Sequence, residues 1–360
     1  MKVLSVASAR PNFVKLAAVH HAIIESGHED ISHVIVHTGQ HYDPLLSDVF
    51  FEQLKIPQPA FNLGVHGGER EEVIEKTQDE LEKVLPKINP DIVLVYGDVN
   101  GALGAAQAAK NVGIKLAHVE AGLRSFDSSM PEEHNRMGID RIADLLFCSE
   151  ESGVENLKKE GAKGEIHLIG NTMIDTLIRM TPIIESESVP VEIIKPFGVI
   201  TLHRPSNVDD KKTLAAVLSF FDDVAHHIPL VLPVHHRLRH AMQEFGLIFP
   251  PHIRAIDALG YIPFLQLMKE AAFILTDSGG IQEEAVLIGK RCFTLRKNTE
   301  RPSTIESGSN VLITDIEDPA QREKVLSFAK NPHDPKITIP EFWDGHAGER
   351  IVDILTYIKN

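Results

Sequence analysis

The sequence predicts an α/β protein of two Rossmann-like domains, each built on a doubly wound parallel sheet. In both halves of the 360-residue chain, short and continuously apolar segments alternate with longer segments of helical period. Such apolar strands, separated by helices, are typical of parallel sheets that helices cover on both faces. The length also suits about two domains, each large enough to bury a core of its own.

In the first half, the clearest strand is Asp91–Tyr96, which follows Asn89-Pro90 and ends at Gly97. The segment Pro11–Ser26 is predicted to be a helix, because proline stands in its first turn and Gly27 follows its end. The other strands expected in this half are Lys2–Ala7, His33–Val36, Lys115–Val119, Asp144–Cys148 and Ile166–Ile169.

The second half repeats the pattern, and Thr181–Pro196, which has no clear period, separates the two domains. We therefore expect domains at residues 1–180 and 181–346. Pro332–Phe342 contains three prolines and is expected to cross back in extended form, so that a last helix within 347–360 returns to the first domain. The strands expected in this half are Gly198–Leu202, Leu230–Pro233, Ile253–Ala255, Phe273–Thr276, Arg291–Thr294 and Asn310–Ile313.

Charge and cysteine content exclude several classes of protein. The 36 Lys and Arg residues against 51 Asp and Glu residues give a net charge of −15, unlike a protein whose main role is to hold nucleic acid. Cys148 and Cys292 lie far apart and form no CxxC, so neither a disulfide framework nor a thiolate metal site is predicted. The chain has no apolar stretch of about 18 residues and no signal-like N-terminus, so we expect a cytoplasmic protein that binds no membrane.

Polar residues that follow strands of the first half are candidate site residues, because ligands of open parallel sheets bind beyond the carboxyl ends of the strands. Asp98 and Glu120 should converge at that edge, and their repulsion should raise the pKa of at least one. Glu132 and Arg136 lie four residues apart at a helix start and should share a face, although such a pair is usually only a solvated ion pair.

Two cations flank the first turn from strand to helix. Arg10 stands where a phosphate could meet a helix N-terminus, and Lys15 follows within the same helix. His203 and Arg204 provide a titratable imidazole and a further cation after the first strand of the second half. A single polar residue in such a loop is more often merely solvated. The prediction of a site therefore rests on the number of charged residues that follow strands.

The segment from Thr276 to Ala285 is the strongest single candidate for a phosphate site. A strand ends, Gly279 and Gly280 permit close approach of the backbone, and a helix begins whose free N–H groups suit an anion. Ser278 adds a hydroxyl, and Glu284 could accept hydrogen bonds from two ribose hydroxyls. The pattern is not GxGxxG, so no nicotinamide cofactor is indicated, and an ordinary helix N-cap explains the segment equally well.

Two further features have an ordinary structural explanation. Phe264 could stack on a planar base, but an isolated phenylalanine is more often part of a core. His236 and His240 have the spacing of metal ligands on a helix, but no HExxH frame or cysteine pattern supports them. We therefore predict no metal site.

Together these residues resemble the non-hydrolysing UDP-N-acetylglucosamine 2-epimerase family. The landmarks run in the family order over nearly the whole chain, and as a set they are very specific. They are Ala9-Arg10-Pro11 with Lys15, His37 to Asp43, Gly97-Asp98, His118 to Arg124, Pro131 to Glu133, Asn135-Arg136, Gly170 to Thr172 with Ile174-Asp175, His203 to Asp209, Thr276 to Glu284 and Asn298 to Pro302.

The resemblance implies the GT-B fold, in which two lobes face one another across a cleft. It implies interconversion of UDP-N-acetylglucosamine (UDP-GlcNAc) and UDP-N-acetylmannosamine (UDP-ManNAc) with no added cofactor. In the family, UDP is eliminated to leave a 2-acetamidoglucal, and UDP adds back after C2 is reprotonated on the other face. A UDP-sugar is the implied partner, and a homodimer is the expected assembly.

The resemblance also implies roles for individual residues. The implied catalytic residues are Asp98, Glu120 and Glu132 around C2, with His203 near the pyrophosphate. The implied substrate-binding residues are Arg10, Lys15, Arg136, Arg204, His235, Phe264, Ser278, Gly279, Gly280, Glu284 and Arg301. Gln40 matches one residue of a site at which a second UDP-GlcNAc activates some bacterial relatives. The following Tyr42-Asp43-Pro44 differs from the activated type, so weak or absent activation is expected.

Some positions depart from the family pattern. Asn12 stands where many relatives have Glu or Gln, and Gly101-Ala102 replaces a Ser/Thr pair near Asp98. The loss of two hydroxyls near Asp98 would change contacts with the sugar rather than with the UDP. The alternatives are a 2-epimerase of a UDP-2,3-diacetamido uronic acid, whose relatives share the segment from Ser47 to Phe51, a hydrolysing epimerase, a GT-B glycosyltransferase, and a non-catalytic UDP-sugar sensor.

Overall fold

The computed structural model describes residues 1–39, 50–186, 188, 189 and 191–359. The chain divides into two compact units. Unit 1 comprises Met1–Arg179 and Pro340–Asn360, and unit 2 comprises Met180–Ile339. The C-terminal segment therefore belongs to the same unit as the N-terminus.

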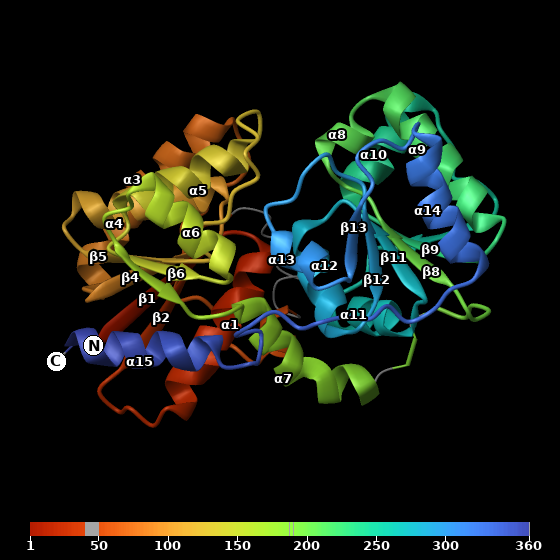
Figure 1. Ribbon diagram of the computed structural model, residues 1–360. Coiled ribbons are helices and arrows are strands. Elements are labelled where there is room, and N and C mark those ends of the chain that lie inside the picture. The colour runs from red at the N-terminus through yellow and green to blue at the C-terminus, as the bar shows by residue number, and fades with distance from the viewer. Residues whose placement is uncertain (40–49, 187, 190, 360) are drawn as a thin grey trace. The chain divides into compact units, whose positions relative to one another are not determined.

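In the described part of the chain, unit 1 contains a seven-stranded sheet in the order β3-β2-β1-β4-β5-β6-β7 (Figure 1). Neighbouring strands pair in parallel. The central strand β4 is buried along its whole length, as its continuous apolar sequence requires. The strands are β1 (Lys2–Ala7), β2 (Ser32–His37), β3 (Phe61–Asn62), β4 (Ile92–Tyr96), β5 (Lys115–Val119), β6 (Leu145–Cys148) and β7 (Glu165–Leu168).

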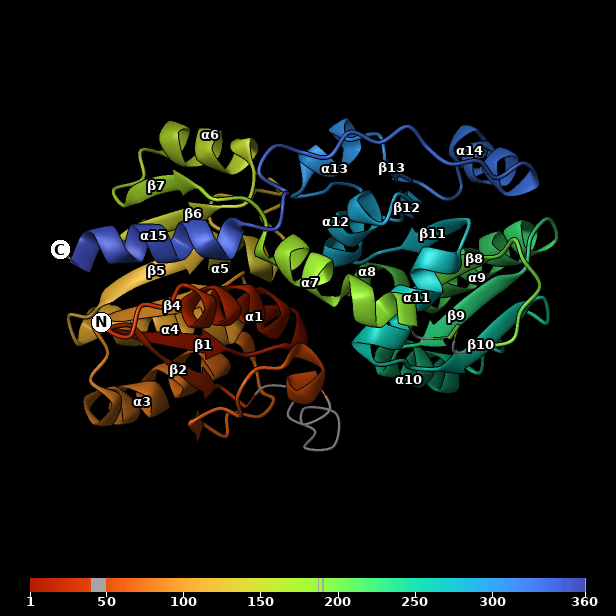
Figure 2. The same ribbon diagram turned by 90° about the horizontal axis from the view of Figure 1, so that it is seen from below.

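Helices cover both faces of this sheet (Figure 1). One core layer joins the sheet to helices α3 to α6, and alanines such as Ala105 and Ala109 let α4 lie close against it. On the other face α15 packs along α1 (Figure 2), where a Cβ on Gly348 would come within 2.6 Å of the Ala18 carbonyl oxygen. The helices are α1 (Arg10–Glu25), α3 (Arg70–Ile88), α4 (Asn100–Asn111), α5 (Pro131–Ile142), α6 (Glu151–Glu160), α7 (Thr172–Ser186) and α15 (Ala347–Lys359).

Among the described residues, unit 2 contains a six-stranded parallel sheet in the order β10-β9-β8-β11-β12-β13 (Figure 2). A large aromatic and aliphatic cluster lies between the sheet and α9, α10 and α14, and a smaller one, which includes Phe197 and Leu267, lies beneath α11. The strands are β8 (Gly198–Thr201), β9 (Leu230–Val234), β10 (Ile253–Asp257), β11 (Phe273–Thr276), β12 (Arg291–Thr294) and β13 (Asn310–Leu312).

The helices of unit 2 are α8 (Pro205–Val208), α9 (Lys211–Ala225), α10 (His236–Phe245), α11 (Tyr261–Glu270), α12 (Gly279–Leu287), α13 (Pro302–Glu306) and α14 (Pro319–Lys330). The α/β class with two parallel sheets is thus confirmed. All the strands expected from sequence are present, and the two-residue strand β3, too short to show a pattern, was missed. Within the described residues, no helix has both the length and the apolar character needed to cross a membrane.

The strand orders fix where ligand-binding loops lie. In unit 1 the order reverses between β1 and β4, and in unit 2 it reverses between β8 and β11. At such a reversal the loops beyond the carboxyl ends of the two strands diverge and leave room for a ligand. Arg10 and Asp98 follow the first pair of strands, and His203 and Ser278 follow the second pair.

Candidate active site

Asp98 lies beyond β4 and is held by residues of α5. Arg136 forms an ion pair with its carboxylate, and the Asn135 side chain donates a hydrogen bond of 2.9 Å to its carbonyl oxygen. The Asp98 side chain remains 29% exposed, whereas that of Arg136 is buried. A carboxylate that is fixed by a buried cation and still reaches solvent is suited to act on a ligand.

Glu120 and Lys15 form a buried ion pair beside the same loop. Glu120 directly follows β5 and adopts a φ of 76°, which turns the chain sharply at the sheet edge. A Cβ on Gly97 would lie 3.1 Å from both Glu120 Oε2 and Lys15 Nζ. The structure therefore gathers Lys15 and Glu120 around Gly97, the residue that directly precedes Asp98.

Arg136 also has a partner on its own helix. Arg136 pairs with Glu133, three residues earlier, in addition to Asp98. Glu133 also accepts hydrogen bonds from the Ser125 N–H at 3.0 Å and the Phe126 N–H at 3.0 Å, so it anchors the loop before α5. Glu132 is half-buried on the same first turn of the helix. Glu133 therefore supports this turn structurally, and the role expected for Glu132 stays a prediction.

A buried network supports the loops that carry Asp98 and Glu120. His118 Nε2 lies 2.9 Å from the Gly97 carbonyl oxygen, and its Nδ1 lies 2.6 Å from Asp140 Oδ1. Arg124 pairs with the other oxygen of Asp140 at 2.8 Å. Burial alone would raise the pKa of Asp140, but His118 and Arg124 together hold it below its usual value.

Arg10 is exposed at the first position of α1. The turn before it is held by Asn12, whose Oδ1 accepts hydrogen bonds from the N–H groups of Ser8 at 3.2 Å and Ala9 at 2.9 Å. Asn12 Nδ2 donates to the Tyr96 carbonyl oxygen at 2.8 Å. The residue that departs from the family pattern is thus buried and fixes the turn that carries Arg10.

In unit 2, Asp277 organises the loop that carries His203. Asp277 is fully buried, its carboxylate accepts hydrogen bonds from the N–H groups of His203 and Arg204, and Asp277 Oδ1 lies 2.9 Å from His203 Nδ1. Burial would raise the pKa of Asp277, but these partners lower it below the usual value. Because Nδ1 faces Asp277, Nε2 is the ring nitrogen that can meet a ligand on the exposed side of His203, whose side chain is 33% exposed.

His235 and Arg204 lie at the same edge of the sheet and are both half-buried. The His235 ring lies 5.2 Å from the His203 ring, centroid to centroid. Its Nδ1 accepts a hydrogen bond from the Arg237 N–H at 3.3 Å and so caps α10. The three residues form one basic group after β8 and β9.

The N-terminus of α12 has the close packing that a phosphate site requires. Ser278 is its N-cap residue and makes no side-chain cap bond, while its N–H donates to Thr276 Oγ1 at 3.0 Å. A Cβ on Gly279 would lie 2.7 Å from Arg301 Nη1, so this position admits only glycine without a shift. Gly280 follows in the first turn. The N–H groups of this turn can bind an anion.

Arg301 lies behind this turn and is buried. Its guanidinium pairs with Glu283 at 2.9 Å and with Glu300, which also pairs with Arg296 at 2.6 Å. Arg301 therefore stands within a network of buried ion pairs beneath Gly279. These contacts shape the α12 turn, and the direct contact of Arg301 with substrate that the resemblance implies stays a prediction.

Glu284 is buried one turn into α12 and hydrogen-bonds to the Tyr261 hydroxyl. Burial, with a further contribution from the charge of Glu283, raises the pKa of Glu284 to about 8, while the Tyr261 hydroxyl opposes the rise. A carboxyl group in this environment is largely protonated at neutral pH, so it can donate as well as accept hydrogen bonds. Phe264, also on α11, is half-buried against the apolar cluster around Phe197, as a core residue would be.

The structure therefore brings together two sets of predicted residues. In unit 1 these are Arg10, Lys15, Asp98, Glu120, Glu132 and Arg136, and in unit 2 they are His203, Arg204, His235, Ser278, Gly279, Gly280 and Glu284. Gln40 and the Tyr42-Asp43-Pro44 segment lie outside the described residues. Sequence reasoning missed Asp277 as the residue that orients His203, although its place directly after β11 was a usable signal.

Two parallel sheets with polar groups at their points of strand reversal define a GT-B-like fold. The same fold is seen in the glycotransferase of kitacinnamycin, which is 12% identical with a TM-score of 0.53 and covers 99% of this chain and 98% of that chain. Residues 25–356 match the family described as UDP-N-acetylglucosamine 2-epimerase. The chain belongs to this family and is an epimerase of UDP-sugar nucleotides.

Two relatives match this chain over nearly its whole length. UDP-GlcNAc 2-epimerase of Methanocaldococcus jannaschii is 38% identical to this chain, and the alignment covers 100% of both chains. A crystal structure of that enzyme with UDP-GlcNAc and UDP gives a TM-score of 0.91 at 37% identity, over 99% of this chain and 100% of that chain. The UDP-2,3-diacetamido-2,3-dideoxy-D-glucuronate 2-epimerase of Pseudomonas aeruginosa is 37% identical over 99% of both chains.

Proposed function

We propose that this chain interconverts UDP-GlcNAc and UDP-ManNAc by eliminating and re-adding UDP. The observation that carries the proposal is the pairing of two carboxylates with buried cations around Gly97, Asp98 with Arg136 and Glu120 with Lys15. Inversion at C2 needs one group to remove a proton and another to deliver a proton to the opposite face. Carboxylates that come from different loops at one sheet edge can meet that need.

The elimination step moves electrons from C2 to the departing diphosphate. A carboxylate of unit 1, from among Asp98, Glu120 and Glu132, takes the C2 proton, the C1–C2 double bond forms, and the C1–O bond breaks toward UDP. Re-addition reverses these changes after C2 has been protonated from the other face. The product then carries the manno configuration.

Unit 2 supplies stabilisation for the leaving group. The bond that breaks leaves negative charge on the β-phosphate, and preorganised donors lower the barrier to that charge. The N–H groups at the start of α12 are such donors, and the imidazolium form of His203, with Nδ1 held by Asp277, would add Nε2–H as a further donor. Glu284 is proposed to hold the ribose.

A UDP-2,3-diacetamido uronic acid is the second candidate substrate. The Pseudomonas relative named for that sugar is as similar to this chain as the UDP-GlcNAc enzyme is. Gly101 and Ala102, in the first turn of α4 after Asp98, have no side-chain hydroxyls. Both residues are buried, and a Cβ on Gly101 would lie 2.3 Å from Ser8 Oγ, so they leave no free space for a bulkier substituent. The similarity to the Pseudomonas relative therefore carries the second candidate.

Proton NMR in D2O with each nucleotide sugar tests both candidates. UDP-GlcNAc should gain deuterium at C2 and give a manno-configured product with a higher kcat/KM than the diacetamido uronate. A higher kcat/KM for the diacetamido uronate would make that sugar the substrate and would leave the proposed chemistry unchanged. Release of free ManNAc, or product without deuterium, would reject non-hydrolysing epimerisation.

A further inference from the structure

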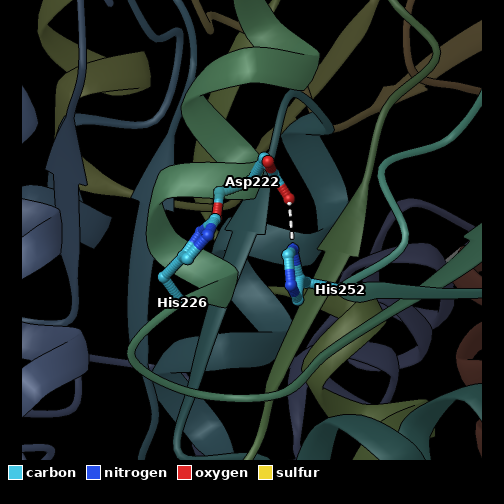
Figure 3. Close-up of side chains that lie close together, drawn as sticks. All are labelled: Asp222, His226 and His252. Atoms are coloured by element: carbon cyan, nitrogen blue, oxygen red, sulfur yellow. Dashed lines mark hydrogen bonds and ion pairs between the residues drawn. The ribbon is translucent and has the colours of Figure 1, made fainter.

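Unit 2 carries a cluster of possible metal ligands that the proposed reaction does not use. Asp222, His226 and His252 lie close together, and each offers one ligand atom within 4.8 Å of the other two (Figure 3). Asp222 lies in the last turn of α9, His226 follows the end of that helix, and His252 directly precedes β10. His226 and His252 are 26 positions apart in the sequence and form no recognisable metal-binding motif. The cluster is therefore visible only in the three-dimensional structure.

The hydrogen bonds of the two imidazoles suit ligation. His226 Nδ1 lies 2.7 Å from the Asp222 carbonyl oxygen, to which it can only donate, so its Nε2 carries the lone pair. Histidines that bind metals commonly donate their other ring N–H to a carbonyl in this way. His252 Nδ1 lies 3.0 Å from Asp222 Oδ1, and the two rings lie 4.4 Å apart, centroid to centroid. Ligands around a tetrahedral zinc ion are separated by roughly 3.3–3.5 Å, so small side-chain rotations suffice.

The electrostatic setting also favours a cation. The cluster lies at the C-terminal end of α9, where the helix dipole is negative. The neighbouring Asp223 is engaged by Arg322, so the Asp222 carboxylate is the acidic group directed at the histidines. Asp222 is half-buried and both histidines are exposed, so an ion would have open access and a water ligand.

We propose that Asp222, His226 and His252 bind one zinc ion with water in the fourth position. Two imidazoles and a carboxylate suit Zn²⁺, whereas Mg²⁺ and Ca²⁺ prefer oxygen ligands. The cluster is at the amino edge of the sheet, because His252 precedes β10, whereas His203 and Ser278 follow strands at the carboxyl edge. The ion therefore ties the end of α9 to the start of β10 and takes no part in the reaction.

Zinc binding to the full-length protein, first stripped with a chelator, tests the proposal. Isothermal titration should show one equivalent of Zn²⁺ per chain, and zinc should raise the Tm of the wild-type protein. The double variant His226→Gln/His252→Gln should lose at least tenfold in affinity and lose the Tm shift, and Asp222→Asn should weaken binding at least fivefold.

His240→Gln is the matched control, because His240 is also exposed in unit 2 and lies 3.6 Å from a carboxylate oxygen, that of Glu244. This variant should bind zinc as the wild-type protein does. The Tm values in chelator show whether each variant is folded. The proposal would be overturned if the wild-type protein bound less than one equivalent of zinc or bound it as weakly as the double variant. Loss of zinc binding in His240→Gln would also overturn it.

Discussion

At the scale of single residues, the proposed chemistry depends on carboxylates that the fold pairs with buried cations. The sequence predicts that Asp98 and Glu120 repel one another. In the structure each carboxylate is paired with a cation, Asp98 with Arg136 and Glu120 with Lys15. Pairing relieves the repulsion and fixes the orientation of each carboxylate. The two carboxylates are therefore held in separate ion pairs at one edge of the sheet.

Replacing these carboxylates by amides tests their part in proton transfer. Asp98→Asn and Glu120→Gln should each lower kcat by about 10²–10⁴-fold, the usual contribution of a positioned acid or base. Deuterium incorporation at C2 and turnover are the measurements, and UDP affinity should change little. The control is Glu71→Gln, an exposed carboxylate on α3, which should keep wild-type turnover. Near-normal kcat in both site variants would remove the proposed mechanism.

Asp277 acts through His203, so its replacement should affect orientation more than binding. Asp277→Asn keeps the size of the side chain but weakens the interaction with His203 Nδ1. We expect kcat to fall by about 10-fold or more, while KM for the nucleotide sugar changes less. A change confined to KM in steady-state kinetics would contradict this assignment.

Glu284 should make stability depend on pH. Its pKa in the folded protein is about 8, against 4.5 when unperturbed, because the group is buried. Between these values the folded state holds a proton that the unfolded state has lost, so the free energy of unfolding falls as pH rises from about 5 to 8. Glu284→Gln should flatten this decline, by up to a few kcal/mol across the window. Urea unfolding at several pH values measures it, and parallel curves for both proteins would refute it.

At the scale of secondary-structure elements, the N-terminus of α12 depends on a position without a side chain. Gly279→Ala would place a Cβ 2.7 Å from Arg301 Nη1 and 2.9 Å from Glu300 Oε1, within a network of buried ion pairs. We expect it to cost about 1–3 kcal/mol of stability and to weaken UDP binding. Ser278→Ala is the comparison, because the Ser278 side chain makes no cap bond and its loss should leave Tm nearly unchanged. Equal Tm values for Gly279→Ala and wild type would show that the turn adapts freely.

Most elements could be predicted from sequence because each leaves a local pattern. The buried strands are continuously apolar, and helices such as α1 have a proline in the first turn and a glycine shortly after the end. Strand β3 left no such pattern, since two residues cannot show a period. Glu133, Asp140 and Asp277 escaped notice as supporting residues because their roles come from contacts with residues distant in sequence or in an adjacent loop. The sequence predicts which residues follow the carboxyl end of a strand. It does not predict which carboxylate pairs with which cation.

At the scale of the whole molecule, we propose that the two units have different parts in binding. Unit 2 holds most of the residues proposed for UDP, and unit 1 holds those proposed for the sugar together with Arg10, which is proposed to lie near the pyrophosphate. Hydrogen exchange should therefore show that UDP alone protects the amides at the start of α12 and after β8. The sugar nucleotide should add protection in the loops around Gly97 and Glu120. Protection by UDP that is confined to unit 1 would reverse the proposed assignment.

The placement of α15 in unit 1 has a consequence for how the chain is made. Unit 2 is inserted between two segments of unit 1, so the ribosome completes residues 180–339 before it makes the helix that covers α1. At about 5–20 residues per second, the apolar surface of α1 waits roughly 10–40 s for its partner after residue 179 has been synthesised. During that interval the nascent N-terminal sheet lacks one covering helix and is a natural client for a chaperone.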